Sequence, residues 1–346
     1  MILSLFSGCG GLDLGFESAG FETGLAYDLR QSAVDSWNAN RMDNQCAHVA
    51  DIAEIRLSRF DKDFGSKFAP SAVIGGPPCQ SFSRANTWKR DDDPREKLVS
   101  KFISIALRLH RHRRSLDFIV MENVQELAAG KYQHILNRQV ERLEAAGFNV
   151  ATHVLDALDY SVPQRRKRLI LVAYNPDAFS ERYWKPPPKA EDQLNVEDAI
   201  AGLEQPAFFA VNIEPDDIPL HRNHWCMVPK SKKFFDGSLC PGTSYGRSFK
   251  TLTWDKPSYT VSYGNREVHV HPSGTRRLSV YEALLLQGFP KTFHLEGNLS
   301  DQITQVSEAV PPPLATAIAE QIESDLNSSA KAKESDHFTA LMTDAG

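Results

Sequence analysis

The sequence has 346 residues, a net charge of −5, a hydrophobic share of 41% and a charged share of 24%. These values are typical of a globular enzyme, and the length predicts one large domain with a smaller one. No apolar run reaches the roughly 18 residues that a membrane-spanning helix needs. Five widely spaced cysteines without a CxxC pair favour reduced thiols in a cytoplasm and argue against a zinc site. The acidic balance argues against general coating of nucleic acid, but a specific nucleic-acid enzyme with local positive charge remains open.

The chain begins with the pattern strand, glycine-rich turn, helix. Residues 2–6 form an apolar run typical of a buried strand, residues 7–11 contain three glycines, and residues 12–20 have a helical pattern. Glycines in such a turn let a ligand approach the backbone closely. The turn is neither GxGxxG nor a phosphate-binding loop with a lysine, so alone it is a weak indication of a nucleotide or nucleoside site.

Two acids follow the next two predicted strands. Residues 23–27 form a strand that ends at Asp28, where a doubly wound fold places an acid that binds ribose. A third strand around residues 46–50 is followed by Asp51. For each acid taken singly, the alternative is a solvated loop carboxylate.

The turn at residues 75–81, Gly-Gly-Pro-Pro-Cys-Gln-Ser, follows a buried strand at residues 69–74. Two glycines and two prolines predict a tight, stiff turn that presents Cys79, and stiffness holds an attacking atom close to its target. The alternative is a structural turn with an inert buried cysteine. Residues 82–97 are polar and charged, which predicts a mobile loop beside Cys79. An amphipathic helix follows at residues 98–109, with a basic cluster at its end that we interpret as solvated.

A second set of candidate residues follows the strand at residues 118–121, which ends in Glu122-Asn123-Val124. A carboxylate at the C-terminal end of a central strand points into the expected ligand crevice. After a helix at residues 134–146 and a strand at residues 150–155, the segment 162–168 leads into another strand. Alternation there places Arg166 and Arg168 on one face, and buried arginines need polar partners.

The proline-rich stretch at residues 185–189 predicts a domain boundary. Residues 220–274 carry eight Lys or Arg against three Asp or Glu, together with several aromatics and glycines. This mixture suits phosphates and base edges, although a small β lobe with ordinary surface lysines is the alternative. Residues 276–290 predict a helix with Ser279 as N-cap and Glu282 completing a capping box. A last helix follows the prolines at 311–313, and from about residue 325 we expect a frayed tail.

Together these motifs resemble the DNA cytosine-C5 methyltransferases over about residues 1–325. The resemblance lies in Phe-Ser-Gly-Cys-Gly-Gly at 6–11, Pro-Pro-Cys-Gln at 77–80, Glu-Asn-Val at 122–124, Gln-Arg-Arg-Lys-Arg at 164–168 and the segment 277–290. It implies an α/β fold, with a Rossmann-like class I S-adenosylmethionine-dependent methyltransferase domain and a smaller, mostly β target-recognition domain. The implied limits are 1–185 for the catalytic domain, 186–274 for recognition, 275–325 for the return to the catalytic domain and 326–346 for a flexible tail.

The resemblance also implies the site residues. The catalytic residues are Cys79, Glu122, Arg166 and Arg168, with Gln80 and Asn123. The residues expected to bind S-adenosylmethionine are Phe6, Gly8, Cys9, Gly10, Gly11, Asp28, Leu29, Asp51, Ile52, Pro78, Leu98, Glu308 and Ala309. The residues expected to contact DNA are Ser81, Ser83, Arg84, Arg222, Lys230, Lys232, Lys233, Arg247 and Arg266, the last two and Arg222 as guanine readers.

The residue types suit this chemistry. A thiolate that adds to C6 of cytosine breaks the aromaticity of the ring and makes C5 electron-rich. A buried carboxylic acid with a raised pKa, here Glu122, drives the addition by protonating N3. Arg166 and Arg168 offer fork donors to O2 and to a phosphate or carboxylate of the site. The stacked base must flip out of the duplex first, and no metal is needed.

One position departs from the family pattern, because residues 307–310 read Ser-Glu-Ala-Val where the family has Gly-Asn-Ala/Ser-Val. Glu308 would attract the ammonium of the cofactor and repel its carboxylate. The expected partners are double-stranded DNA and a cognate restriction endonuclease, and no membrane is expected as a partner. We expect a monomeric enzyme of the cytoplasm, encoded by a bacterium or a phage. The alternatives are an RNA methyltransferase of the same family, a nicotinamide-dependent dehydrogenase, a thiol hydrolase and a catalytically silent DNA-binding module. The recognition sequence is not predicted.

Overall fold

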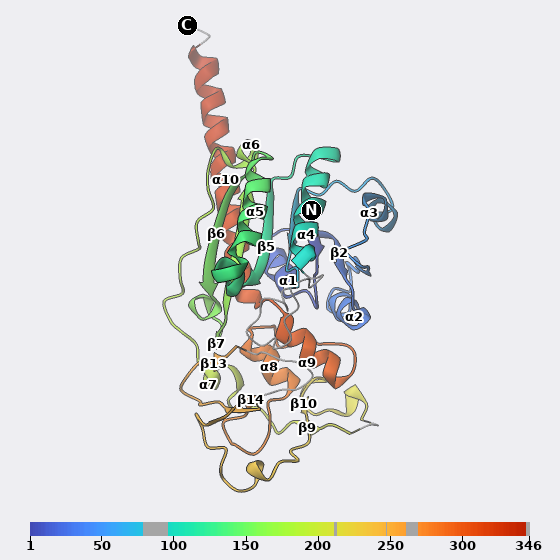
Figure 1. Ribbon diagram of the computed structural model, residues 1–346, viewed down its shortest axis with the longest axis vertical. Helices are drawn as coiled ribbons and strands as arrows, with labels where there is room; N and C mark the ends of the chain where they lie inside the picture. Colours follow the sequence, from blue (N-terminus) through green and yellow to red (C-terminus); the bar gives the residue numbers. More distant parts are fainter. Residues whose placement is uncertain (79–95, 211–212, 247, 261–268, 344–346) are drawn as a thin grey trace.

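The computed structural model describes residues 1–78, 96–210, 213–246, 248–260 and 269–343, and its centre is a seven-stranded sheet of order β3-β2-β1-β4-β5-β8-β6 (Figure 1). Strand β8 runs antiparallel to β5 and β6, whereas the remaining neighbours pair in parallel. The doubly wound α/β fold expected from the sequence is confirmed. The strands of the sheet are β1 Ile2–Leu5, β2 Thr23–Asp28, β3 Ala47–Val49, β4 Ala72–Gly75, β5 Phe118–Val124, β6 Asn149–Asp156 and β8 Lys167–Tyr174.

Helices cover both faces of the sheet because the central strands are apolar on both sides. In β5, Ile119 and Met121 enter one hydrophobic core, and Phe118 and Val120 enter the other. Alternate side chains of a strand point to opposite faces, which accounts for this division. The first core contains residues of α3, α4 and α5, and the second contains residues of α1, α6 and α10.

The helices begin and end close to the limits expected from the sequence in most cases. The helix expected at residues 98–109 is longer than that range. The helix expected at residues 276–290 is shorter, because Gly288, with a φ of 74°, follows its end. The helices are α1 Gly11–Ser18, α2 Gln31–Ala39, α3 Leu57–Phe64, α4 Glu96–His112, α5 Gln133–Glu144, α6 Pro176–Phe179, α7 Val196–Ile200, α8 Val280–Leu286, α9 Leu299–Glu308 and α10 Pro312–Thr343. Short 3-10 helices are η1 Gln125–Ala128, η2 Gly130–Tyr132, η3 Ala157–Tyr160, η4 Pro215–Asp217 and η5 Lys232–Phe234.

The C-terminal segment differs from its expectation. Helix α10 continues past residue 325 to Thr343 and projects beyond the body of the molecule (Figure 1), where the sequence analysis expects a frayed tail. The physical reason is composition, because residues 314–343 contain no glycine or proline and include many Ala, Glu and Lys. The Lys333 ammonium also donates a hydrogen bond to the carbonyl of Asp177.

Below the sheet in Figure 1, the described residues between 196 and 308 form short strands and loops around α7, α8 and α9. The strands outside the central sheet are β7 Gln164–Arg165, β9 Ala207–Phe208, β10 Trp225–Cys226, β11 Ser244–Tyr245, β12 Phe249–Thr251, β13 Ser258–Tyr259 and β14 His269–Val270. Strand β13 pairs with β7, immediately before Arg166. This pairing joins the lower region directly to the catalytic segment predicted at residues 164–168.

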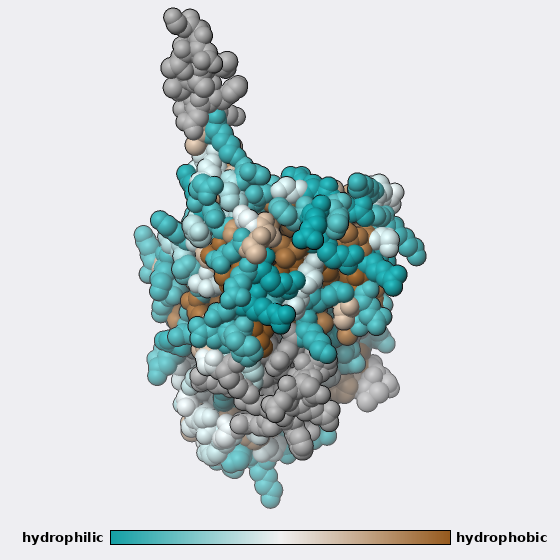
Figure 2. Space-filling view, turned by 45° about the horizontal axis from the view of Figure 1, so that its top comes forward, coloured by the Kyte–Doolittle hydropathy of each residue, from teal (hydrophilic) through white to brown (hydrophobic). Residues whose placement is uncertain are grey.

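The face drawn in Figure 2 is largely hydrophilic, with smaller apolar areas between the polar side chains. Within the described part of the chain, none of the helices is both long enough and apolar enough to span a membrane.

Candidate active site

The site lies where the strand order reverses. The chain runs from β1 outward to β2 and β3, and then returns to β4 on the other side of β1. In such sheets, ligands bind beyond the carboxyl ends of the strands at this point. Phe6, Asp28 and Glu122 all lie at these ends, so the structure brings the predicted cofactor and catalytic residues to one edge of the sheet.

The glycine-rich turn is fixed by the predicted ribose acid. The carboxylate of Asp28 accepts hydrogen bonds of 2.9 Å from the backbone N–H groups of Gly8 and Arg30. Phe6 has a φ of 57°, a left-handed backbone that is costly for a residue with a side chain and is concentrated at functional sites. Burial raises the pKa of the Cys9 thiol to about 12, so Cys9 is a packing residue here and no nucleophile.

The residues present fit a nucleoside cofactor. Among the described residues other than its chain neighbours, none has an atom within 4 Å of where a Cβ would stand on Gly8, so this side of the turn has room for a ligand. Leu29, directly after Asp28, leaves 66% of its surface exposed at the same edge, which suits contact with an adenine ring. Ile52 is buried, whereas Asp51 is exposed and accepts a hydrogen bond from the N–H of Ala53. Of the remaining predicted residues, Gly10 and Gly11 lie in the turn, Ala309 is buried, and Pro78 and Leu98 are half-buried.

Glu308 forms an ion pair that the sequence analysis missed. Its carboxylate lies 2.6 Å from the guanidinium of Arg30, and Arg30 also lies 3.7 Å from Asp28. The pair joins the start of α2 to the end of α9 beside the cofactor edge. The sequence places the cation Arg30 two positions after Asp28, but only the fold brings it to Glu308, 278 positions later.

The catalytic edge is built around Glu122. Arg168 Nε lies 2.7 Å from Glu122 Oε1, and both side chains are largely buried. A Cβ on Gly76 would stand 3.2 Å from Glu122 Oε2, so the carboxylate lies against the turn that precedes Cys79. Asn123 Nδ2 donates a buried hydrogen bond of 3.0 Å to the carbonyl of Pro77 and anchors the same turn. Glu122 and Asn123 therefore both lie against the turn at Gly76 and Pro77, which precedes Cys79 in the sequence.

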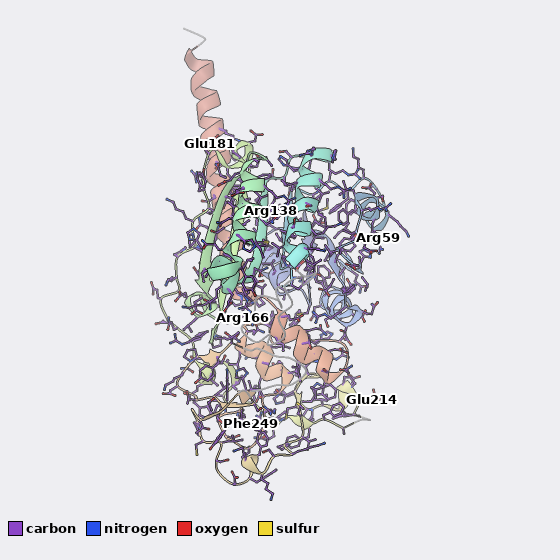
Figure 3. The ribbon with its side chains drawn as sticks, in the orientation of Figure 1. Arg59, Arg138, Arg166, Glu181, Glu214 and Phe249 are labelled. Atoms are coloured by element: carbon purple, nitrogen blue, oxygen red, sulfur yellow. The ribbon has the colours of Figure 1, made fainter. Side chains whose placement is uncertain are left out.

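Arg166 and Arg168 share a face, as the alternation predicts, but they make different contacts. Arg165 and Lys167 are exposed, whereas Arg166 is 1% exposed. The Arg166 guanidinium donates hydrogen bonds of 2.8 and 2.9 Å to the carbonyls of Ser307 and Ala309. These contacts fasten the β7–β8 segment to the end of α9, and the role of both arginines toward the base or a phosphate stays a prediction. In Figure 3, Arg166 lies where the central sheet meets the lower region.

The predicted DNA-contacting residues fall into two groups. Arg222 lies 3.1 Å from Glu296, and the ammonium of Lys233 lies 3.9 Å from the centre of the Tyr245 ring. Lys230 and Lys232 are exposed. The predictions on Cys79, Gln80, Ser81, Ser83, Arg84, Arg247 and Arg266 fall on residues outside the described ranges. Within those ranges, no group of three or more His, Cys, Asp or Glu side chains is arranged to hold a metal ion.

The sheet order, with β8 antiparallel between β5 and β6, is that of the class I methyltransferase fold. The chain belongs to the C-5 cytosine-specific DNA methylase family, whose model matches residues 1–324. It is therefore a cytosine C5 DNA methyltransferase, as the sequence motifs predicted.

Its relatives extend over nearly the whole chain. The Type II methyltransferase M.FnuDI of Fusobacterium nucleatum is 30% identical, over 96% of this chain and 97% of its own length. M1.HphI of Haemophilus parahaemolyticus is 33% identical, over 92% of this chain and 86% of its own length. Among solved structures, a candidate DNA modification methyltransferase encoded within an E. coli prophage has a TM-score of 0.74 at 22% identity, covering 94% of this chain and 99% of that one. That likeness concerns the fold alone.

Proposed function

We propose that this chain methylates C5 of a cytosine within a specific double-stranded DNA sequence, with Cys79 as nucleophile and S-adenosylmethionine as methyl donor. The family match and the Type II relatives support the reaction. The Pro-Pro-Cys-Gln motif and its place directly after β4 support the nucleophile. A flipped cytosine would lie between this turn and Glu122.

The thiolate of Cys79 forms a bond to C6, and the electrons of the C5–C6 double bond shift through the ring toward N3. A proton at N3 stabilises this charge and leaves an enamine, whose C5 attacks the methyl group. S-adenosylmethionine supplies that methyl on a sulfonium, an electrophile that leaves as a neutral thioether. A base then removes the C5 proton, the double bond reforms as the thiolate leaves C6, and N3 gives up its proton.

Glu122 is the group proposed to serve N3. In the structure it is an ion-paired carboxylate, with Arg168 2.7 Å away. Delivery of a proton to N3 thus requires Glu122 to carry one when the base enters. The Arg168 guanidinium is placed to donate hydrogen bonds to the carboxylate or to O2 of the base.

Arg166 is proposed as a positioning residue. Its two bonds to the carbonyls of Ser307 and Ala309 tie the strand that carries Arg168 to the segment beside Arg30 and Glu308. The catalytic and cofactor edges are thereby held in one arrangement. For the cofactor itself, we assign Asp28 to the ribose, Leu29 to the adenine face and the Gly8–Gly11 turn to close backbone approach.

Sequence specificity is proposed to reside in residues 186–274, which combine local positive charge with aromatic side chains. With the Type II relatives, these features favour a cytoplasmic restriction–modification methyltransferase that acts as a monomer, alongside an endonuclease for the same sequence. The C-terminal residues 326–343 form a helix outside both regions.

The observation that carries the proposal is the Glu122 carboxylate held by Arg168 against the turn that precedes Cys79. The test is mechanism-based trapping. Duplex DNA with 5-fluorocytosine at the methylated position should form a covalent adduct, because fluorine cannot leave as a proton, and Cys79→Ser should abolish both adduct and turnover. An active enzyme that fails to trap would exclude Cys79 as nucleophile. Labelled cofactor offered with DNA and with transfer RNA separates DNA from RNA as substrate.

A further inference from the structure

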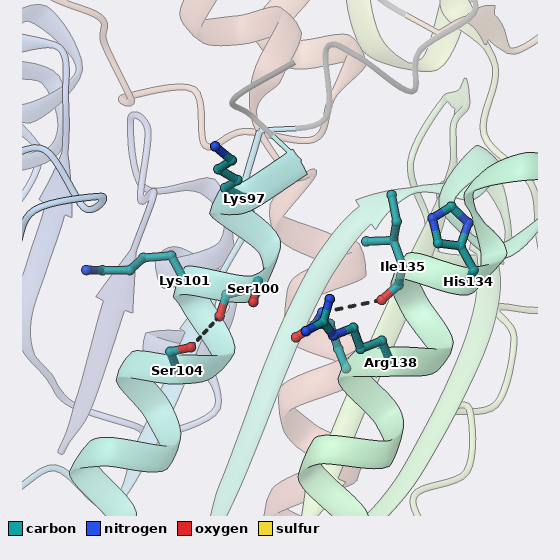
Figure 4. Close-up of a pocket in the computed structure, with 8 residues that line it drawn as sticks. Lys97, Ser100, Lys101, Ser104, His134, Ile135 and Arg138 are labelled. Atoms are coloured by element: carbon teal, nitrogen blue, oxygen red, sulfur yellow. Dashed lines mark hydrogen bonds between the residues drawn. The ribbon is translucent and has the colours of Figure 1, made fainter. Parts of the chain in front are cut away.

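A groove whose lining contains none of the predicted catalytic residues is formed by polar and basic side chains of α4 and α5. It has a volume of about 450 Å³, with Lys97, Ser100 and Ser104 on α4 and His134, Arg138 and Gln139 on α5 (Figure 4). Lys101 and Ile135 complete its lining. In Figure 3, Arg138 lies on the upper body, well separated from Arg166.

Arg142 of α5 holds three of the side chains that line this groove. Its guanidinium donates hydrogen bonds to the Ser100 hydroxyl at 3.0 Å, the Ser104 hydroxyl at 2.7 Å and the side-chain oxygen of Gln139 at 2.7 Å. Ser104 donates its own proton to the carbonyl of Ser100. Within the described part of the chain, the Ser100 hydroxyl only accepts, so its proton is available to an anionic oxygen.

The basic side chains of the groove form no ion pair within the part of the chain that the structure describes. Among the described residues, no carboxylate lies within ion-pair distance of Lys97, Lys101, Arg138 or Arg142. Burial and the neighbouring charge of Arg138 lower the pKa of Arg142. Such mutual repulsion raises the energy of the empty groove, and a bound anion would remove it.

The groove lies between the N-terminal parts of α4 and α5, the two helices that follow β4 and β5 in the chain. Helix α4 begins after the segment that follows Cys79, and α5 begins shortly after Glu122 and the end of β5. Lys97 and His134 lie at these first turns and point toward the same end in Figure 4. From Lys97 to Ser104 the helix rises about 10 Å, a length over which a DNA duplex carries several phosphates.

We propose that the groove between α4 and α5 binds backbone phosphates of the DNA duplex beside the target base pair, with Lys97 and Arg138 as the principal contacts and Ser100 as a hydrogen-bond donor. This site lies outside residues 186–274 and contributes affinity without sequence choice. The inference rests on DNA being the substrate. A double helix fits better than a small anion, because the cations spread along the helices rather than converging on one point (Figure 4).

The test compares Lys97→Gln/Arg138→Gln with Arg108→Gln/Arg111→Gln. The control removes the same charge from exposed positions of α4 outside the groove. Binding to a duplex of about 40 base pairs with arbitrary sequence is measured over a salt series. Each phosphate contact contributes about 0.9 to the slope of log K against log salt concentration, so the groove variant should lose about 1 to 2 units of slope and the control none. Ethylation of individual phosphates should weaken DNA binding by the parent and leave DNA binding by the groove variant unchanged.

The outcomes separate this inference from the proposed function. A groove variant with the slope and ethylation pattern of the parent overturns the groove, even if the enzyme methylates DNA. Inorganic phosphate binding that depends on Lys97 and Arg138, without any change in DNA binding, identifies a small-anion site and also overturns it. If the groove variant loses binding to an acidic protein while its DNA binding is intact, that result also overturns the proposal. The expected variant retains methyl transfer at low salt, because Glu122 and Arg168 are untouched.

Discussion

Arg30 and Glu308 form an ion pair of 2.6 Å across the rim of the cofactor edge. About a third or more of each side chain is exposed, and ion pairs of this kind contribute about 0 to 1 kcal/mol to stability. Such a small contribution does not explain a charged residue where the family has an amide. The pair instead balances charge beside Asp28, so that Glu308 is not an isolated carboxylate facing the cofactor.

Reversal of charge tests this role. Glu308→Lys should place two cations side by side and weaken S-adenosylhomocysteine binding about 10-fold, while the exchanged pair Arg30→Glu/Glu308→Arg should recover part of the affinity. Glu308→Asn should change the melting temperature little. Calorimetric titration of each variant gives the coupling energy, and strictly additive losses would show that the two residues act independently.

The strands and the acids at their ends were predictable, because apolar runs alternate with glycine turns and Asp28 and Glu122 follow directly. The contacts of Arg166 were not, since sequence periodicity gives the face of a side chain and not its partner across 141 positions. The Arg30–Glu308 pair and the α4–α5 groove depend on the same kind of distant contact. The helix beyond residue 325 was not predicted because this segment is polar, although its Ala, Glu and Lys residues have high helix propensity.

Glu122→Gln keeps the shape of the side chain but cannot transfer a proton. General acid catalysis contributes about 10²–10⁴-fold, so the turnover rate should fall by that factor while cofactor affinity stays nearly unchanged. Arg168→Met should also lower turnover, because it leaves Glu122 without its 2.7 Å partner. Single-turnover methylation measures both. A Glu122→Gln enzyme with near-normal rate would assign the proton transfer to another group.

Asp13 predicts a pH dependence of stability. It is fully buried in α1, and burial raises its pKa from 3.8 to about 6. The native state therefore keeps this proton at a higher pH than the unfolded chain, so the stability it contributes is present below about pH 4 and is lost as pH rises through 6. Asp13→Asn should remove this loss and raise the free energy of unfolding near pH 8 by up to about 3 kcal/mol. Denaturant titrations at several pH values test it, with exposed Asp35→Asn as control; equal pH profiles for parent and Asp13→Asn would contradict the prediction.

The buried pair Arg276–Glu282 predicts a strong single-variant effect. The guanidinium bonds both carboxylate oxygens at 2.8 and 2.7 Å, and Glu282 also completes the α8 capping box with Ser279. Arg276→Met should destabilise the fold by about 3–5 kcal/mol because it leaves a buried charge unpaired. Arg276→Met/Glu282→Leu should lose less than the single variant. Lys189→Met at an exposed pair is the control and should cost less than about 1 kcal/mol.

The location of sequence specificity is tested by exchange of residues 186–274 with the corresponding region of a Type II relative. The catalytic edge acts on a flipped base and does not contact flanking pairs, so the choice of site must come from groups that reach base edges. The chimera should methylate the donor's sequence, which sequencing of methylated cytosines in an expressing host reveals.

Arg222 is a narrower case, because its 3.1 Å contact with Glu296 must be exchanged for a contact with guanine if it reads DNA. Arg222→Ala should then cost about 1–3 kcal/mol in specific binding and relax one position, whereas Lys230→Ala/Lys232→Ala should weaken all sequences equally. An active chimera that keeps the parent sequence would place specificity outside this region, and an Arg222→Ala enzyme with unchanged stringency would leave that arginine to its ion pair.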